Sequence, residues 1–477
     1  MSVTADLGTP IASTSEERQI AIRLSTKDSN YTIPPAKFLV PASWRRFQLS
    51  ELINKVLEND SPIPFDFLID QTLLRSSLGA YCQQTNTSEE IVLDVEFLPS
   101  TLPPQLESTV PSEDWVSDVS ARVPGAILTS SYAGTLSLQQ QDQNLTFSGH
   151  ELSVLSTSYV PHPLGESSKA NGKSWIASGG MDRIGRIWEY EAPQLSLVDV
   201  APTPVAPQCI YTLSLHQAPI SSVRSRPVSH SSTQSMEAPH LLTAGWDGLI
   251  GVWDLTPGVN EEEALESNGE RSKKKRRKSQ VSSNIKNKTP MSVLRGHSNK
   301  VSRAIFDRNG DSHLAYSASW DHSVRVWDLA HGIERENKMS DKVHLDLAQL
   351  ATPSLLLTGS TDRLLSLFDL RTSSLSSISL SLSGHSGPVS SVSAHPTNPL
   401  MFCSASYDST IKVWDARSPK QSLFTLEMPQ KEEAGEKEKV LCVDWDGERI
   451  VAGGEGARIA LWRVKGTEKP EEIGVEK

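Results

Sequence analysis

A short pattern repeats along the C-terminal three-quarters of this 477-residue chain, and it restricts the fold more than any other feature. The segments SASWDHSVRVWDL (317–329) and SASYDSTIKVWDA (404–416) share a small residue, a turn aspartate, an alternating strand and a Trp-Asp pair. Two degenerate copies have their turn positions at residues 133 and 456. Together with five better copies they make seven. In those five, the turn residue and a bulky ring lie six positions apart: Asp182/Trp188, Asp247/Trp253, Asp321/Trp327, Asp362/Phe368 and Asp408/Trp414.

Each copy predicts four short strands, because apolar residues alternate and turn residues separate the runs. A histidine precedes four of the copies, at His150, His216, His297 and His385. These features resemble the WD-repeat family, in which each repeat forms one blade of a β-propeller. The resemblance implies a mainly β protein with a seven-bladed WD-repeat propeller over residues 113–465.

The recurring polar residues have two interpretations, because serine, histidine and aspartate also form the triads of hydrolases. An active site is normally unique in a chain, whereas this set recurs from copy to copy. In WD-repeat proteins the same residues form hydrogen-bond chains inside the blades, and buried polar groups require such partners. We therefore predict structural roles for Asp182, Trp188, Asp247, Trp253, His297, Asp321, Trp327, Asp362, His385, Asp408 and Trp414.

Two intervals between turn positions, 182 to 247 and 247 to 321, exceed the usual repeat length of about 40–45 residues. The second includes residues 256–290, which contain no aromatic and almost no aliphatic side chains and are predicted to be disordered. This insertion carries a run of six cations. Such a run indicates a nuclear localisation signal; weak rRNA contact is the alternative, and a solvated linker without a function is the third interpretation. The run consists of Lys273, Lys274, Lys275, Arg276, Arg277 and Lys278.

The segment before the propeller lacks the repeated pattern and has a different sequence of expected elements. Residues 1–18 are predicted to be disordered, and residues 19–98 to form a ubiquitin-like β-grasp domain. The proline-rich residues 99–112 predict a semi-rigid linker, and residues 466–477 are expected to be a tail. The β-grasp prediction rests on strands at 19–24, 31–33 (with a continuation at 38–40), 65–69 and 91–97, a helix at 49–57 and a short helix at 73–81.

Composition narrows the functional class. The formal net charge of −11 argues against a surface built to coat nucleic acid. The four cysteines are far apart and show no metal-ligand or disulfide spacing. We find no secretory signal at the N-terminus and no apolar run of the roughly 18 residues that a membrane span needs. We therefore expect a soluble protein of a reducing compartment that has no membrane partner.

A β-grasp domain containing PFDFLI and LLRSSL ahead of a seven-bladed propeller closely resembles ribosome-biogenesis proteins of the Ytm type. These are the WD-repeat subunits of the PeBoW, or Nop–Erb–Ytm, complex. The junction SEDWVS (112–117) and the basic insertion match the same pattern. The resemblance implies a fungal, non-enzymatic assembly factor for the large ribosomal subunit that is required for pre-rRNA processing. It also implies a location in the nucleus, with nucleolus and nucleoplasm.

The resemblance further implies partners. The propeller is expected to bind an Erb-type WD-repeat protein, and through it a Nop/pescadillo-type subunit, on pre-large-subunit particles. The AAA ATPase midasin is expected to bind the ubiquitin-like domain and release the factor. Midasin holds a Mg²⁺ ion, which prefers oxygen ligands, so this chain needs no cofactor of its own. The matching carboxylate here is Glu90, with Glu89 as the alternative.

The sequence allows two other interpretations of the function. A WD-repeat protein can be the substrate receptor of a ubiquitin ligase, although a β-grasp pattern stands here where an F-box would be expected. A Notchless-type pre-ribosome factor would have eight WD repeats instead of seven. The sequence leaves open which face of the propeller holds a partner.

Overall fold

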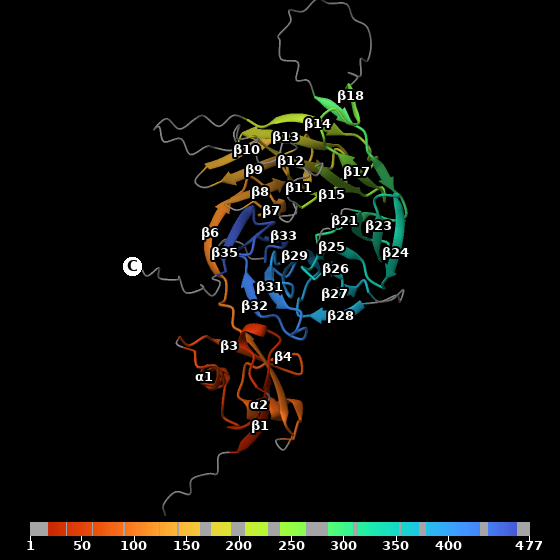
Figure 1. Ribbon diagram of the computed structural model, residues 1–477. Helices are drawn as coiled ribbons and strands as arrows, with labels where there is room; N and C mark the ends of the chain where they lie inside the picture. The colour runs from red at the N-terminus through yellow and green to blue at the C-terminus, as the bar shows by residue number, and fades with distance from the viewer. Residues whose placement is uncertain are drawn as a thin grey trace, which may run out of the picture. The chain divides into compact units, whose positions relative to one another are not determined.

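The computed structural model describes residues 18–464 apart from 35, 60, 89–90, 124, 141–142, 163–172, 192–205, 228–238, 264–284, 309–310, 312, 353, 372–377 and 430–436. The chain divides into two compact units, residues 1–101 and 102–477 (Figure 1). Each unit has hydrophobic clusters of its own.

The N-terminal unit is a five-stranded sheet with the order β2-β1-β5-β3-β4, in which the first and last long strands, β1 and β5, run parallel. This topology is that of a β-grasp, as predicted. Its elements are β1 (Gln19–Ser25), the 3-10 turn η1 (Ser29–Tyr31), β2 (Lys37–Pro41), α1 (Arg46–Leu57), β3 (Phe65–Ile69), β4 (Thr72–Leu73), α2 (Leu78–Thr85) and β5 (Leu93–Pro99).

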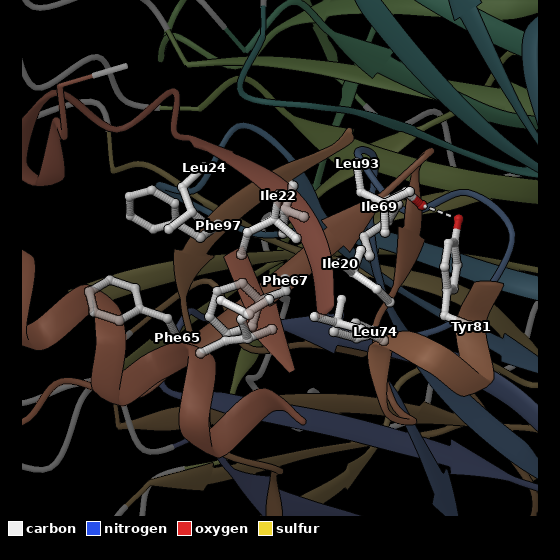
Figure 2. Packing of buried hydrophobic residues seen from close by; sticks show 14 of the residues in the cluster. Ile20, Ile22, Leu24, Phe65, Phe67, Ile69, Leu74, Tyr81, Leu93 and Phe97 are labelled. Carbon is white, nitrogen blue, oxygen red and sulfur yellow. Dashed lines mark hydrogen bonds between the residues drawn. The ribbon is translucent and has the colours of Figure 1, made fainter. Parts of the chain in front are cut away.

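The core of this unit follows from period-2 alternation in the strands. Ile20, Ile22 and Leu24 of β1 belong to one buried cluster with Phe65 and Phe67 of β3, and Figure 2 shows these side chains gathered together. The phenolic hydroxyl of Tyr81 donates to the carbonyl of Ile69 at 3.2 Å, which attaches α2 to the sheet.

Two boundaries differ from the sequence prediction. The strand expected at 31–33 does not form: η1 ends at Tyr31 and residues 32–33 are irregular, because the Asp28 side chain accepts a hydrogen bond from the Asn30 amide at 3.0 Å and bends the chain there. The helix expected at 73–81 begins only at Leu78. Ser77 is its N-cap and accepts from the Ala80 amide, while residues 72–73 pair with β3 instead.

The second unit is a ring of seven sheets, which confirms the predicted seven-bladed propeller. Blade 1 holds β7 (Val116–Ser120), β8 (Ala126–Ser131), β9 (Thr135–Gln140) and β10 (Gln143–Ser148). Blade 2 holds β11 (Val154–Val160), β12 (Lys173–Gly180), β13 (Gly185–Glu191) and β14 (Gln208–Leu213). Blade 3 holds β15 (Ile220–Ser225), β16 (His240–Gly245), β17 (Ile250–Asp254) and β20 (Ser292–Leu294).

Blade 4 holds β21 (Val301–Phe306), β22 (Leu314–Ser319), β23 (Ser323–Asp328) and β24 (Ile333–Met339). Blade 5 holds β25 (His344–Gln349), β26 (Leu355–Ser360), β27 (Leu364–Asp369) and β28 (Ile378–Ser383). Blade 6 holds β29 (Val389–Ala394), β30 (Met401–Ser406), β31 (Thr410–Asp415) and β32 (Phe424–Glu427). Blade 7 holds β33 (Val440–Trp445), β34 (Arg449–Gly454), β35 (Arg458–Arg463) and β6 (Gln105–Pro111). The first strand of each blade lies nearest the centre of the ring (Figure 1).

The ring is closed by residues that the sequence assigned to a linker. β6 pairs antiparallel with β35 as the outer strand of blade 7, so the predicted linker 99–112 is wrong for residues 105–111. Blade 7 has no later strand among the described residues, and an unpaired edge would leave the backbone groups of β35 without partners. Arg463 adds a hydrogen bond to Glu107 at 2.5 Å across this pair.

The predicted disordered insertion, 256–290, is ordered at both ends. β18 (Glu261–Glu263) and β19 (Lys286–Lys288) form a hairpin that extends blade 2, with β19 parallel to β14. Glu261 accepts hydrogen bonds from Lys286 at 2.6 Å and from the Tyr211 hydroxyl at 2.9 Å. Burial would raise the pKa of Glu261, but these bonds outweigh it and lower the pKa to about 2. The middle of the insertion, 264–284, lies outside the described residues.

Candidate functional site

The repeated polar residues form one hydrogen-bond chain per complete blade. In blade 6, His385 Nδ1 lies 2.9 Å from Asp408 Oδ2, and His385 Nε2 lies 2.8 Å from Ser404 Oγ. Trp414 Nε1 donates to the same hydroxyl at 2.8 Å. Equivalent chains join His150, Asp182, Ser178 and Trp188 in blade 2, His216, Asp247, Thr243 and Trp253 in blade 3, and His297, Asp321, Ser317 and Trp327 in blade 4.

These chains hold the aspartates in their charged form. Burial alone would raise the pKa of Asp408, but hydrogen bonds from His385 and Thr410 outweigh it and hold the pKa well below its ordinary value. The same balance depresses the pKa of Asp321, with His297 as the main donor. Because each polar atom is engaged by its neighbours, the arrangement resembles a scaffold rather than a set poised for catalysis.

Blade 5 departs from this scheme. Asp362 occupies the turn as predicted, but its side chain is exposed and contacts no histidine among the described residues. The ring position holds Phe368, which packs against the buried His344 with ring centroids 5.6 Å apart. Burial, with a smaller contribution from the nearby His322, lowers the pKa of His344 to about 4. A phenyl ring cannot donate a hydrogen bond, so this blade is stabilised by packing.

Sequence reasoning missed an ion cluster at the centre of the ring. Arg224 donates to both oxygens of Asp118, at 2.9 and 3.2 Å, and Arg303 lies 3.9 Å from the same carboxylate. Arg303 also binds Asp346, with one donor 2.9 Å from Oδ2. These four residues, the central ion cluster, come from the innermost strands of blades 1, 3, 4 and 5, and Ser156 of blade 2 donates to Asp118 at 2.8 Å. The cluster therefore ties distant blades together.

One end of the propeller carries a second repeated feature. In every blade the amide of the residue before the turn position donates to the carbonyl of the residue before the innermost strand, over 2.9–3.3 Å. This bond involves only backbone atoms, so it does not dictate the fourteen side chains. Nevertheless five of the fourteen are aromatic, against 6 % of the whole chain, and they are Trp115, Tyr132, Trp246, Trp320 and Tyr407.

Two lysines at the same positions stack on these rings. Lys300 Nζ lies 4.0 Å from the ring centroid of Trp246 and 4.9 Å from that of Trp320. Lys439 Nζ lies 5.6 Å from the centroid of Tyr407. Trp115 is 46 % exposed, and Trp320 and Tyr407 are each 39 % exposed. We call the five aromatic residues and two lysines the aromatic end face. Exposed tryptophan and tyrosine side chains gathered in this way are typical of protein interfaces.

The comparison with known proteins decides the family. The sequence profile described as "NLE (NUC135) domain" matches residues 20–82, and the profile "WD domain, G-beta repeat" matches 207–254, 288–328 and 376–415. The chain is 36 % identical to "Ribosome biogenesis protein YTM1" of Laccaria bicolor over 447 residues, which cover 92 % of this chain and 93 % of that protein. It is 34 % identical to the protein of the same name from Coprinopsis cinerea, with 95 % and 96 % covered. The chain belongs to the Ytm1 family.

The Ytm1 family relatives extend to Aspergillus oryzae, whose ribosome biogenesis protein ytm1 is 32 % identical over 503 residues and covers 95 % of this chain and 97 % of its own. This Ytm1-family chain therefore acts in ribosome biogenesis. Among solved structures, the WD40 β-propeller domain of Doa1 superposes with a TM-score of 0.53 at 18 % identity, covering 78 % of this chain and 98 % of that domain. That likeness supports the propeller fold alone.

Several functional residues predicted from the Ytm-type resemblance lie outside the residues that the structure describes. Glu89 and Glu90 lie outside the described residues, between α2 and β5. The cations Lys273–Lys278 also lie outside them, between β18 and β19. The roles assigned to these residues therefore stay predictions. Within the described part of this Ytm1-family chain, no three His, Cys, Asp or Glu side chains gather into a metal-binding group, and no helix could span a membrane.

Proposed function

We propose that the protein is a non-catalytic adaptor in assembly of the large ribosomal subunit, acting in the nucleus and nucleolus. In this proposal the propeller holds an Erb-type WD-repeat protein, and through it a Nop/pescadillo-type subunit, on the pre-large-subunit particle. The ubiquitin-like domain is the handle by which midasin removes the factor. The observation that carries the adaptor role is the aromatic end face, because its exposed rings serve no hydrogen-bond chain of the scaffold.

The end face is the propeller surface best suited to a folded partner. Trp320 and Trp246 hold Lys300 between them, so a partner would meet a rigid, partly apolar platform with one central cation. Such aromatic anchors supply most of the binding energy in protein interfaces. The backbone hydrogen bonds beneath them fix the platform before binding, which lowers the entropy cost of association.

Replacing Trp320 by alanine is expected to weaken binding of the Erb-type propeller about tenfold or more, because a central aromatic anchor is lost. Isothermal titration calorimetry with the purified partner measures the change. Ile333→Ala is the matched control, since Ile333 is 57 % exposed on β24 of the same blade but lies outside the end face. Equal affinities for Trp320→Ala and the wild type, with the wild type binding, would place the partner on another surface.

The release mechanism gives a separate prediction. Residues 1–101 form a compact unit with its own core, so this unit can be tested as a fragment against the adhesion-site domain of midasin. We expect binding to need Mg²⁺ and to fall about tenfold or more in Glu90→Ala, because a carboxylate ligand to the ion is removed. Surface plasmon resonance with and without chelator reports both dependences.

Two further substitutions show whether the effect belongs to Glu90, to Glu89, or to the loss of any exposed negative charge. Glu51→Ala removes an exposed glutamate that pairs with Lys55 on α1, and should bind as the wild type does. A loss in Glu89→Ala but not in Glu90→Ala would transfer the role to Glu89. Metal-independent binding of all variants would contradict the proposed handle.

A further inference from the structure

The junction between blade 7 and blade 1, where the propeller closes, lacks the aromatic side chain that fills the other junctions (Figure 1). In blades 2–7 the aromatic residue six positions after the turn shares a buried cluster with the preceding blade, as Trp188 does with Leu128 and Leu136 of blade 1. The same position in blade 1 holds Gln139, on β9. The described cluster that joins blades 7 and 1 contains no aromatic residue, so this junction lacks a large planar group.

Two other members of the hydrogen-bond chain are also replaced by smaller side chains in blade 1. The histidine lies four positions before the innermost strand in blades 2, 3, 4 and 6, and that position in blade 1 is Ser112. Ala133 replaces the turn aspartate. Only Thr129 keeps its type, since it stands at the position of the serine or threonine that accepts from the indole. Blade 1 therefore lacks an imidazole, an indole and a carboxylate that a complete blade contains.

A cavity of about 320 Å³ lies where these side chains are missing. Its lining includes Ser112, Thr129 and Gln139, together with Val110 and Ile459 of blade 7. A cavity of about 150 Å³ engineered into another protein is large enough to bind benzene, so there is room here for a bicyclic ring. Aliphatic walls combined with a few polar groups are typical of sites for small ligands.

Two hydrogen-bond acceptors in the cavity have no donor. In blades 2, 3, 4 and 6 the hydroxyl at the Thr129 position accepts from an indole N–H at 2.7–2.9 Å. The Thr129 hydroxyl donates to the Ser137 carbonyl at 3.5 Å and accepts from no described residue. Gln139 Oε1 is buried, and none of the described residues donates to it. A buried acceptor without a donor costs free energy, which favours a ligand that carries an N–H group.

The lining of the cavity carries little charge. Glu113 is the one charged residue in its described lining, and this residue is exposed. The other polar groups are hydroxyls and amides, and several of them bond to one another. Ser137 donates to Asn144 Oδ1 at 2.6 Å. Because the lining offers no cation and its one carboxylate is exposed, an uncharged ligand matches it better than an anion does.

We propose that this cavity binds an uncharged aromatic ring with an N–H donor, which is the chemistry of an indole. The ring takes the place of the missing tryptophan, and its N–H donates to Thr129 Oγ1 or Gln139 Oε1. The indole belongs either to a small molecule or to a tryptophan side chain of another protein, and the recognition is the same for both. None of the lining residues belongs to the aromatic end face, so the site is independent of the surface assigned to the Erb-type protein.

Equilibrium dialysis of the full-length protein against indole tests the site. We expect saturable binding by the wild type and binding at least about tenfold weaker in Gln139→Trp, because the new side chain fills the cavity as Trp188 fills the next junction. Gln421→Trp is the matched control, since it makes the same exchange at an exposed position outside the cavity. Its affinity for indole should equal that of the wild type.

A second variant and a second compound test the hydrogen bond. Thr129→Val removes the hydroxyl and nearly keeps the side-chain shape, so it should bind indole about threefold to tenfold more weakly. This variant keeps the proposal testable if Gln139→Trp does not fold. Indene has nearly the same ring shape without the N–H, and the wild type should bind it at least about threefold more weakly than indole.

N-acetyltryptophanamide distinguishes the two sources of the ring, because it carries the indole on a peptide-like backbone. Binding of this compound as well as of indole supports a tryptophan side chain as the ligand. Binding of indole with exclusion of the larger compound supports a small molecule. Absence of indole binding by the wild type, equal affinity for indole in Gln139→Trp, or equal affinity of the wild type for indene and indole overturns the proposal.

Discussion

Replacing Asp118 by alanine is expected to destabilise the propeller by about 3–5 kcal/mol, because the guanidinium of Arg224 would remain buried without its carboxylate. Arg303 keeps Asp346 as a partner, so most of the loss arises at Arg224. Ser156 and the Thr157 amide would also lose their acceptor. Urea unfolding followed by tryptophan fluorescence measures the change, since Trp44 alone of the eleven tryptophans lies outside the propeller unit.

Glu107→Ala is the matched control for this substitution. It removes a carboxylate bound by Arg463 at the outer rim, where the two side chains are 32 % and 58 % exposed. Exposed ion pairs contribute about 0–1 kcal/mol, so this variant should unfold close to the wild type. If Asp118→Ala were no less stable than Glu107→Ala, the central ion cluster would not be holding the blades together.

Asp408→Ala and Asp362→Ala form a second pair of substitutions. Both aspartates occupy the turn position of their repeat, but Asp408 belongs to a hydrogen-bond chain and Asp362 is exposed. Asp408 accepts from His385, from the Ser386 amide and from Thr410, so its loss leaves several donors unsatisfied and should cost about 2–3 kcal/mol. Asp362 is exposed and lacks the histidine, so its replacement should change stability by about 0.5 kcal/mol or less. Thermal unfolding of both variants measures the difference. Equal melting temperatures would refute the structural role of Asp408.

The pH dependence of this pair has a defined sign. The pKa of Asp408 is lower in the folded protein than the value of about 3.9 in an unfolded chain. The unfolded chain therefore binds the proton more readily, and the contribution of Asp408 to stability is complete above about pH 4 and declines as the pH falls below it. The stability gap between the wild type and Asp408→Ala should narrow in the same range. If the difference in unfolding free energy between the wild type and Asp408→Ala stayed constant down to pH 2, Asp408 would not stabilise the fold through its charged form.

The candidate site shows which functional residues could be predicted from the sequence and which could not. The chain from His385 to Trp414 was predictable, because its members recur at fixed spacings in several copies. The aromatic residues of the end face were visible in the same copies, as in the Trp-Asp of SASWDH, but their exposure was not. Whether Trp246 of blade 3 is covered, for example, depends on the next blade, which contributes Lys300 at 4.0 Å from its ring centroid.

The sequence by itself determined the number of blades, the turn positions and the β-grasp order, because each rests on alternation and turn residues within a few tens of positions. Tertiary structure decided the rest. The sequence QLESTVP joins blade 7 only because β35 offers an unpaired edge 356 positions from Glu107. Asp118 and Arg224 lie 106 positions apart and meet only when the ring closes. Local patterns carry no record of such pairings, since they arise when distant strands are brought side by side and buried charges must find partners.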